Sequence, residues 1–189
     1  MFFTCLRITA GTLIAAGTGF AQLTPPQAGS PSQVGRGVIV DEPPGGVRAA
    51  SAPVLSPAER TAVTIAGKKI VVRYGAPSVR KRVIFGGLVP YRAVWRAGAN
   101  DATALHTEAE LSIGGLTVPK GDYTIFVWVE EQQWQLIVNR QTGQTGLQYD
   151  PKMDLGRVPM VLNTPAKKIE KYKMTLSKIG PAEGQLQLA

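Results

Sequence analysis

Five residues with binding chemistry fall within one short stretch of the sequence: Tyr91, Trp95, Arg96, Asn100 and Asp101. An aromatic face beside a guanidinium and an amide can hold a sugar, an anion or the end of a peptide. In a purely structural alternative, Trp95 closes the end of the domain and Arg96 pairs with Asp101. Asn100 would then hydrogen-bond to the loop backbone. We predict the ligand-binding role for the five residues and keep the structural role as the alternative.

The residues that could support catalysis or metal binding are few. His106 is the only histidine, so a metal site or a Ser-His-Asp triad would depend on it, and no second histidine can join it. Glu108 and Glu110 have the spacing of a paired-carboxylate site if they share one strand face. Leu111 and Ile113 take the opposite parity, so we expect both glutamates to face solvent, without the buried setting that an acid catalyst needs. We therefore predict no catalytic residue, no metal ligand and no cofactor.

The segments that must position these residues alternate apolar and polar side chains with a period of two, which is typical of half-buried strands. Residues 66–68 contain Gly67 and predict a tight hairpin turn, and residues 123–129 are apolar at both parities, which predicts a central strand. The expected strands cover residues 63–65, 70–74, 111–113, 116–118, 123–129, 133–138, 158–162, 172–176 and 186–188. About eight or nine short strands favour an all-β antiparallel β-sandwich, with a small β-barrel as the alternative.

One segment does not follow strand alternation. The stretch from Gly75 to Thr103 carries all five candidate site residues and has no sustained period of either two or 3.6. A long irregular insertion in a compact domain is usually functional or packed as a cap. We therefore expect this stretch to lie outside the strand ladder and to carry the site.

The N-terminal segment has the features of a cleavable signal peptide over residues 1–21. Arg7 precedes an uncharged apolar run, and small residues at Gly19 and Ala21 suit cleavage before Gln22. That run is shorter than the span of about 20 residues that a bilayer requires, so we expect no stable membrane span. Cys5 is the only cysteine and lies in this segment, so the mature domain would have no disulfide. Residues 22–52 are rich in proline, glycine and small residues and predict a disordered linker, leaving a β-sandwich domain over residues 53–189.

The sequence also resembles a known family. The motifs "RYGAPSVRKRVIFGGLVPYRAVWRAGANDAT", "LSIGGLTVPKGDYTIF" and "WQLIVNRQTGQTG" resemble the exported bacterial proteins of the domain of unknown function 2911 family, roughly from Ser51 to Leu188. The resemblance implies a periplasmic or secreted β-sandwich and implies no activity. Members of that family usually continue past a last strand, so we expect the domain of this chain to be truncated and to lack a closing strand after Leu188.

Three functional hypotheses follow from these observations. The first is a non-catalytic, periplasmic or secreted binding domain for a glycan, a peptide or an anionic small molecule. The second is a structural envelope domain that associates with itself through an unpaired last strand. The third is an enzyme of unrecognised class. The formal charge is +8 at pH 7, but the basic residues are spread along the chain without a recognition motif, so we expect no nucleic-acid partner.

Overall fold

The computed structural model describes residues 3–10 and 55–189 of the chain. These residues form strands and one short 3₁₀ turn, η1 (Pro151–Met153). The first strands are β1 (Phe3–Ala10), β2 (Ala58–Ile65), β3 (Lys68–Gly75), β4 (Ala93–Trp95), β5 (Thr103–Thr107) and β6 (Leu111–Ile113). The later strands are β7 (Leu116–Val118), β8 (Gly121–Val129), β9 (Trp134–Asn139), β10 (Asp154–Asn163), β11 (Met174–Lys178) and β12 (Glu183–Leu188).

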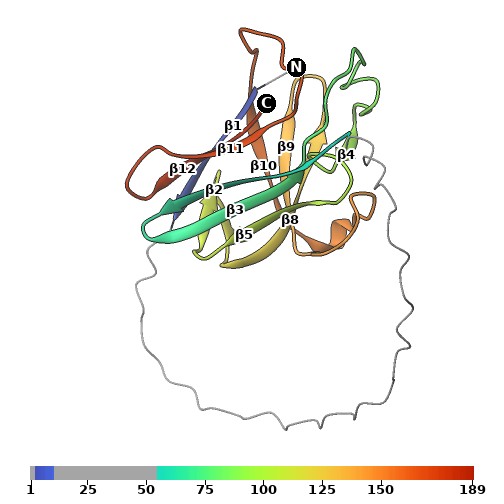
Figure 1. Cartoon of the computed structure of the whole chain (residues 1–189). Coiled ribbons are helices and arrows are strands. Elements are labelled where there is room, and N and C mark those ends of the chain that lie inside the picture. The colour runs from blue at the N-terminus through green and yellow to red at the C-terminus, as the bar shows by residue number, and fades with distance from the viewer. Residues whose placement is uncertain (1–2, 11–54) are drawn as a thin grey trace, which may run out of the picture. The chain divides into compact units, whose positions relative to one another are not determined.

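The strands form two antiparallel sheets that pack face to face (Figure 1). One sheet contains β2, β3, β5, β8, β9 and β10, and β4 pairs with the end of β8. The other contains β11, β12, β1, β6 and β7, and β1 also pairs with the end of β10. The inward side chains of both sheets form one apolar core. This arrangement confirms the predicted β-sandwich, and the sheets do not close into a barrel.

Two local predictions are confirmed by the backbone. Ala66 and Gly67 have φ values of 49° and 75°, and they join β2 to β3 in a two-residue hairpin. Positive φ at both turn residues matches the twist of a β-hairpin. Strand β8 lies between β5 and β9, and its residues 123–127 are buried at both parities, as expected of a central strand.

The stretch from Gly75 to Thr103 is less irregular than its sequence indicates. It contains β4, in which Trp95 is the register partner of Val127 on β8, so the prediction that this stretch lies outside the strand ladder is wrong at this point. Three residues are too few for a period of two to be visible in the sequence. Glu108 and Glu110 do not share a strand, because β5 ends at Thr107 and β6 begins at Leu111, and Glu108 lies in a bend. Both glutamates are exposed, as expected.

Strand β12 is not an edge strand. It pairs with β11 on one side and with β1 on the other, so the expected unpaired last strand is not present in the described part of the chain. Strand β1 lies within the segment predicted as a signal peptide, and Figure 1 shows it (blue) beside β10 and β12. Residues 11–21 of that segment and the predicted linker, residues 22–52, lie outside the described residues. No helix in the described residues is both long and apolar enough to cross a membrane.

Candidate functional site

A cavity of about 470 Å³ opens at one end of the sandwich, beside β4. Its walls come from the loop before β4, from β4 itself, from the loop after β9 and from the segment before β11. The residues that line it are mainly aliphatic and aromatic, including Val79, Ile84, Phe85, Leu88, Val89, Val94, Trp95, Leu147 and Tyr172. We call this space the Trp95 cavity.

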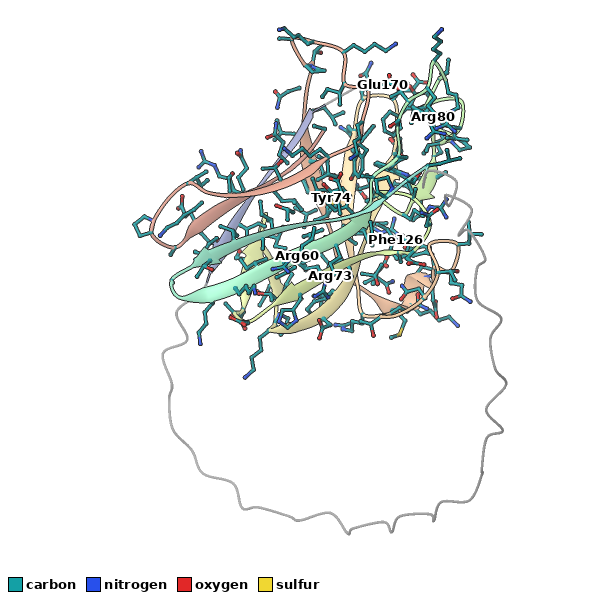
Figure 2. The ribbon with its side chains drawn as sticks, in the orientation of Figure 1. Arg60, Arg73, Tyr74, Arg80, Phe126 and Glu170 are labelled. Carbon is teal, nitrogen blue, oxygen red and sulfur yellow. The ribbon has the colours of Figure 1, made fainter. Side chains whose placement is uncertain are left out.

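The loop that forms one wall of the Trp95 cavity is tied to the segment before β11. The backbone N–H of Val79 donates to the carbonyl of Glu170 at 2.7 Å, and that of Tyr172 donates to Pro77 at 2.8 Å. The Glu170 carboxylate also accepts from the backbone N–H of Arg80 at 2.8 Å. Figure 2 shows Arg80 and Glu170 at the same end of the molecule. These bonds fix the wall even though the loop has little regular structure.

Aromatic rings line one side of the cavity. The half-buried ring of Trp95 lies edge-to-face with Phe85 at 5.5 Å and with Tyr172 at 5.2 Å between centroids. Phe85 also lies 4.5 Å from the buried ring of Trp134 on β9. Aromatic pairs at these separations stabilise one another beyond their buried area. The cluster therefore presents a rigid aromatic wall.

Tyr172 combines a ring that lines the cavity with a hydroxyl that is buried. That hydroxyl has no hydrogen-bond partner among the described residues. Burial raises the pKa of Tyr172 well above its ordinary value of 10.0, and the neighbouring Tyr74 adds to this shift. A buried polar atom without a partner costs about 1–3 kcal/mol, so such atoms are rare and often mark functional sites.

Among the described residues, two charged side chains line the cavity, those of Arg82 and Arg96. Arg82 donates from Nε to the carbonyl of Val79 at 3.1 Å and from Nη2 to that of Ser78 at 2.8 Å. Nη1 of Arg96 lies 3.5 Å from the carbonyl oxygen of Asn100. Neither guanidinium forms an ion pair with a carboxylate of the described residues. Arg82 is exposed and Arg96 is half-buried, so two positive charges without a counter-charge among the described residues lie at the border of the cavity.

Two glycines allow the backbone around Arg96 to pack as it does. A Cβ at Gly146 would lie 2.2 Å from Cδ of Arg96 and 2.6 Å from the carbonyl oxygen of Asn100. A Cβ at Gly75 would lie 2.1 Å from the carbonyl oxygen of Ala99. No real side chain tolerates such distances, so glycine is required for these close approaches.

Only two of the five predicted site residues, Trp95 and Arg96, line the Trp95 cavity. Tyr91 lines a neighbouring depression of about 310 Å³, on the other side of Phe85. Asn100 and Asp101 line a separate cavity of about 430 Å³ on the outer face of the sheet. The structure therefore divides the predicted cluster among three places.

The separate cavity also contains two arginines. Arg60 and Arg73 are register partners on β2 and β3, both are exposed, and Figure 2 shows them side by side. The side-chain amide of Asn100 donates to the carbonyl of Ser56 at 3.1 Å, which is the backbone contact expected of a structural role. The alternative ion pair between Arg96 and Asp101 is not formed. The backbone of Asp101 forms an isolated antiparallel β-bridge with that of Thr145.

Three residues of the cavity were not predicted from the sequence: Arg82, Phe85 and Tyr172. Arg82 and Phe85 lie in the irregular stretch, and their types alone could have suggested them. Tyr172 was expected only as a member of a strand, and it lies just before β11 instead. No local signal brings it to the cavity, because its position depends on contacts with residues almost 100 positions earlier.

His106 lies on β5, opposite Asp122 on β8, as an ordinary strand residue. Its Nδ1 lies 2.8 Å from Oδ1 of Asp122, and the two side chains are 41% and 68% exposed. This exposure gives neither side chain the enclosed setting of a catalytic base. The described residues contain no group of three or more histidine, cysteine, aspartate or glutamate side chains that could hold a metal ion.

Comparison with known proteins gives one match. Residues 56–189 match the model of a family described as a protein of unknown function, DUF2911. The match covers β2 to β12 and every residue of the Trp95 cavity. No curated protein and no solved structure matches the chain.

Proposed function

Because the chain belongs to the DUF2911 family, whose description carries no activity, we propose its function from the geometry of the Trp95 cavity. The protein is a non-catalytic binding domain that holds a small anion with an apolar body. The anionic group pairs with Arg82 and Arg96, and the apolar body lies against Trp95. The basic and apolar N-terminal sequence supports a periplasmic or secreted location for this binding.

One observation carries the proposal: Arg82 and Arg96 line an apolar cavity whose described lining contains no carboxylate. A guanidinium is more weakly hydrated than an ammonium group, and its planar donors match the geometry of a carboxylate or a phosphate. The volume of about 470 Å³ lies within the range of about 300–1,000 Å³ that is typical of small-molecule sites. The ligand class is therefore a carboxylate or phosphate joined to an aromatic or acyl group.

The same lining argues for binding rather than catalysis. Its polar side chains are the two arginines, Ser56, Ser78 and Tyr172, and no histidine, lysine or acid among the described residues lines the cavity. A hydroxyl nucleophile needs an adjacent base, and the cavity offers none. Arginine stays protonated in proteins and cannot serve as that base. The cavity can therefore hold and neutralise an anion without a group that transfers protons.

The proposal is tested by titrating the full chain with phenyl phosphate, phenol and inorganic phosphate while following tryptophan fluorescence. We expect phenyl phosphate to bind at least about tenfold more tightly than either fragment, because it alone engages both the charges and the aromatic wall. Replacing Trp95 by phenylalanine should remove most of the fluorescence change. Equal responses to phenol and phenyl phosphate would refute the assignment of an anion.

The matched variants are Arg96→Met and Arg60→Met. Methionine keeps the apolar stem of arginine and removes only the charge and its donors. Arg96→Met should weaken phenyl phosphate binding about 10- to 100-fold, which corresponds to the loss of one charge-assisted hydrogen bond. Arg60 lines a different cavity, so Arg60→Met should leave the affinity unchanged. An effect of the same size in both variants would show that only net charge matters.

A further inference from the structure

The described residues expose eight large apolar side chains, and five of them lie around the mouth of the Trp95 cavity. Those five, which we call the apolar rim, are Leu55, Val83, Leu88, Tyr91 and Leu147. Leu147 is 85% exposed, Val83 72%, Leu55 62% and Leu88 60%. Single exposed apolar residues are common on protein surfaces, whereas several gathered at one place mark a surface that contacts a partner or a membrane.

The loop before β4 presents three of these side chains on a fixed backbone. The backbone N–H of Leu88 donates to the carbonyl of Val83 at 3.1 Å, and that of Val89 donates to the carbonyl of Ile84 at 2.7 Å. Val83 and Tyr91 line the same depression beside the cavity, and Leu88 lines the cavity itself. The exposure of the three side chains is therefore a property of the folded loop.

Basic side chains flank the apolar rim. Residues 76–97 contain five arginines and lysines and no acidic residue. Arg80 donates from Nη2 to the carbonyl of Leu55 at 3.1 Å, and Lys168 lines the depression with Val83 and Tyr91. Four exposed basic residues, which we call the basic collar, form no ion pair with a carboxylate of the described residues: Arg80, Lys81, Arg92 and Lys168. The nearby carboxylate of Glu170 accepts from the backbone N–H of Arg80 at 2.8 Å.

The backbone of the basic collar does not explain its residue types. Arg80, Lys81 and Arg92 have φ values of 50°, 60° and 58°, in the left-handed region. Glycine and asparagine adopt this region at a lower cost than arginine or lysine. Turn formation alone would therefore favour other residues at these three positions, and the basic side chains require another reason.

We propose that the apolar rim and the basic collar dock this protein on the surface of a bilayer that contains anionic lipids. The rim side chains enter the headgroup layer, and the collar pairs with lipid phosphates. Apolar insertion and a polybasic patch together give a stable attachment where either alone is weak. The proposal goes beyond the function proposed for the Trp95 cavity. It would bring the mouth of that cavity to molecules that have an anionic group and an acyl body.

Two features favour a bilayer over a protein partner. The apolar rim comes from three separate segments around an open cavity, whereas the core of a protein interface is packed as densely as a protein interior. The collar contributes charges of one sign, and charged residues, lysine above all, are depleted at the core of protein interfaces. A layer of anionic headgroups matches the sign of the collar and attracts each of its members.

The test measures binding of the full chain to vesicles by co-sedimentation. The vesicles contain either phosphatidylcholine alone or equal parts of phosphatidylcholine and phosphatidylglycerol. We expect binding to the second kind to be at least about tenfold tighter, because each basic residue near the surface gains from the negative potential of the lipids. Equal binding to both kinds, or binding to neither, would overturn the proposal.

Val83→Asp tests the apolar rim, with Ile179→Asp as its matched control. Ile179 is 45% exposed and directly follows β11, whereas the segment that contacts the loop before β4 precedes β11. Both variants place the same charge at an exposed apolar position, and the rest of the chain, including its apolar N-terminal run, is common to both. We expect Val83→Asp to weaken vesicle binding at least about tenfold and Ile179→Asp to leave it unchanged. Equal effects would show that the rim is not the docking surface.

Lys81→Gln tests the basic collar, with Lys68→Gln as its control. Lys68 begins β3, whose eight residues span roughly 25 Å, and the loop that carries Lys81 follows the other end of this strand. That length exceeds the Debye length of about 8 Å at physiological salt. We expect Lys81→Gln to weaken binding about fivefold and Lys68→Gln to weaken it less than about twofold. If both variants lower binding alike, the collar has no special position and the proposal fails.

Two further measurements separate the alternatives. In sedimentation velocity, a dimer of the full chain that Val83→Asp abolishes and Ile179→Asp keeps would assign the rim to contact between copies and overturn the proposal. Phenyl phosphate binding is measured separately on the same chain. If phenyl phosphate binds and vesicles do not, the docking surface is wrong and the function proposed for the cavity stands. If only vesicles bind, the function proposed for the cavity is wrong and the docking surface stands.

Discussion

The ring of Trp95 meets the ring of Tyr172 edge-to-face, with centroids 5.2 Å apart and an interplanar angle of 68°. On its other side, Tyr172 meets the ring of Tyr74 at 5.7 Å and 87°. Tyr172 therefore contacts both Trp95, which lines the cavity, and Tyr74, which belongs to the core. Tyr74 and Tyr172 are both buried, but only Tyr74 has hydrogen-bond partners for its hydroxyl among the described residues. This difference makes the two tyrosines a matched pair for experiment.

Tyr172→Phe should leave the free energy of unfolding unchanged or raise it by up to about 1 kcal/mol. The substitution removes a buried hydroxyl that has no partner and keeps the ring contacts, so the desolvation cost disappears and no hydrogen bond is lost. Urea unfolding followed by fluorescence measures the change.

Tyr74→Phe is the control for this prediction. The Tyr74 hydroxyl donates to Oε2 of Glu59 at 3.0 Å and lies 3.3 Å from the carbonyl oxygen of Met174. We expect its loss to lower the free energy of unfolding by about 1–2 kcal/mol. If Tyr172→Phe is as destabilising as Tyr74→Phe, the hydroxyl of Tyr172 has a partner and the interpretation is wrong.

Gly146→Ala should weaken anion binding in the Trp95 cavity. The new methyl carbon would lie only 2.2 Å from Cδ of Arg96, so the Arg96 side chain must move away from its present position. We expect phenyl phosphate affinity to fall by about tenfold or more, because a charge-assisted hydrogen bond depends strongly on geometry. Isothermal titration calorimetry of the full chain measures the effect.

Gly143→Ala separates this effect from general strain in the same loop. Gly143 has a φ of 75° and nothing near its missing Cβ, so alanine there strains the backbone without touching Arg96. We expect a loss of stability of about 1 kcal/mol with unchanged affinity. Equal losses of affinity in both variants would mean that loop strain, rather than the position of Arg96, controls binding.

The sequence predicted the sandwich well because burial has a period of two in most of its strands. The alternation through residues 70–74 and 111–113 is visible without the structure, and so are the glycines between the paired strands. Strand β1 could not be predicted in the same way. Its residues include Arg7 and lead into the apolar run that predicted a signal peptide, and only pairing with distant strands makes them a strand.

The site was predicted less completely than the fold. Trp95 and Arg96 of the irregular stretch line one cavity, and ligand binding there stays a prediction. We expected Arg96 and Asp101 to lie together because they are close in sequence. Ala97 and Asn100 have left-handed backbone conformations, with φ values of 52° and 65°, and turn the chain between Arg96 and Asp101. Asp101 therefore lies in a different cavity. Gly98 and Asn100 mark a turn in the sequence, but they do not show where the chain leads after it.

Ile137→Ala should be strongly destabilising, although Gln135 on the same strand is a residue typical of a solvated face. Ile137 is fully buried and is the register partner of Phe126, whose ring lies 4.9 Å from that of Tyr149. The loop after β9 thus covers a second apolar cluster on the outer face of the sheet. We expect a loss of about 2–5 kcal/mol in urea unfolding.

Val161→Ala is the matched control for Ile137→Ala. Val161 lies on β10 and is 61% exposed, so its truncation leaves no cavity and should change stability by less than about 0.5 kcal/mol. A loss below about 1 kcal/mol for Ile137→Ala would show that the loop after β9 does not cover this face in solution.

Glu59 should make the domain lose stability as the pH falls into the acidic range. A hydrogen bond with Lys171 lowers the pKa of Glu59 below its ordinary value of 4.5, and the Tyr74 hydroxyl also contributes. A carboxylate with a lowered folded pKa stabilises the fold fully above its unfolded pKa, and this stabilisation is lost as pH falls through the folded pKa. The difference in unfolding free energy between the unchanged chain and Glu59→Gln should therefore shrink between about pH 5 and about pH 3. Because the Glu59 side chain is 31% exposed, solvent screening keeps the difference small.

Lys171→Met identifies which partner is responsible for this pH dependence. In the Lys171→Met background, the further change Glu59→Gln should have a smaller and less pH-dependent effect, because the main cause of the lowered pKa is already gone. Most of the remaining effect would come from the Tyr74 hydroxyl and a smaller part from Lys173, so adding Tyr74→Phe should reduce it further. Urea unfolding of the full set at several pH values gives each coupling energy. The effect of Glu59→Gln on the unfolding free energy could have the same pH dependence with and without Lys171. In that case the lysine does not hold the carboxylate ionised, and the Tyr74 hydroxyl becomes the principal cause of the lowered pKa.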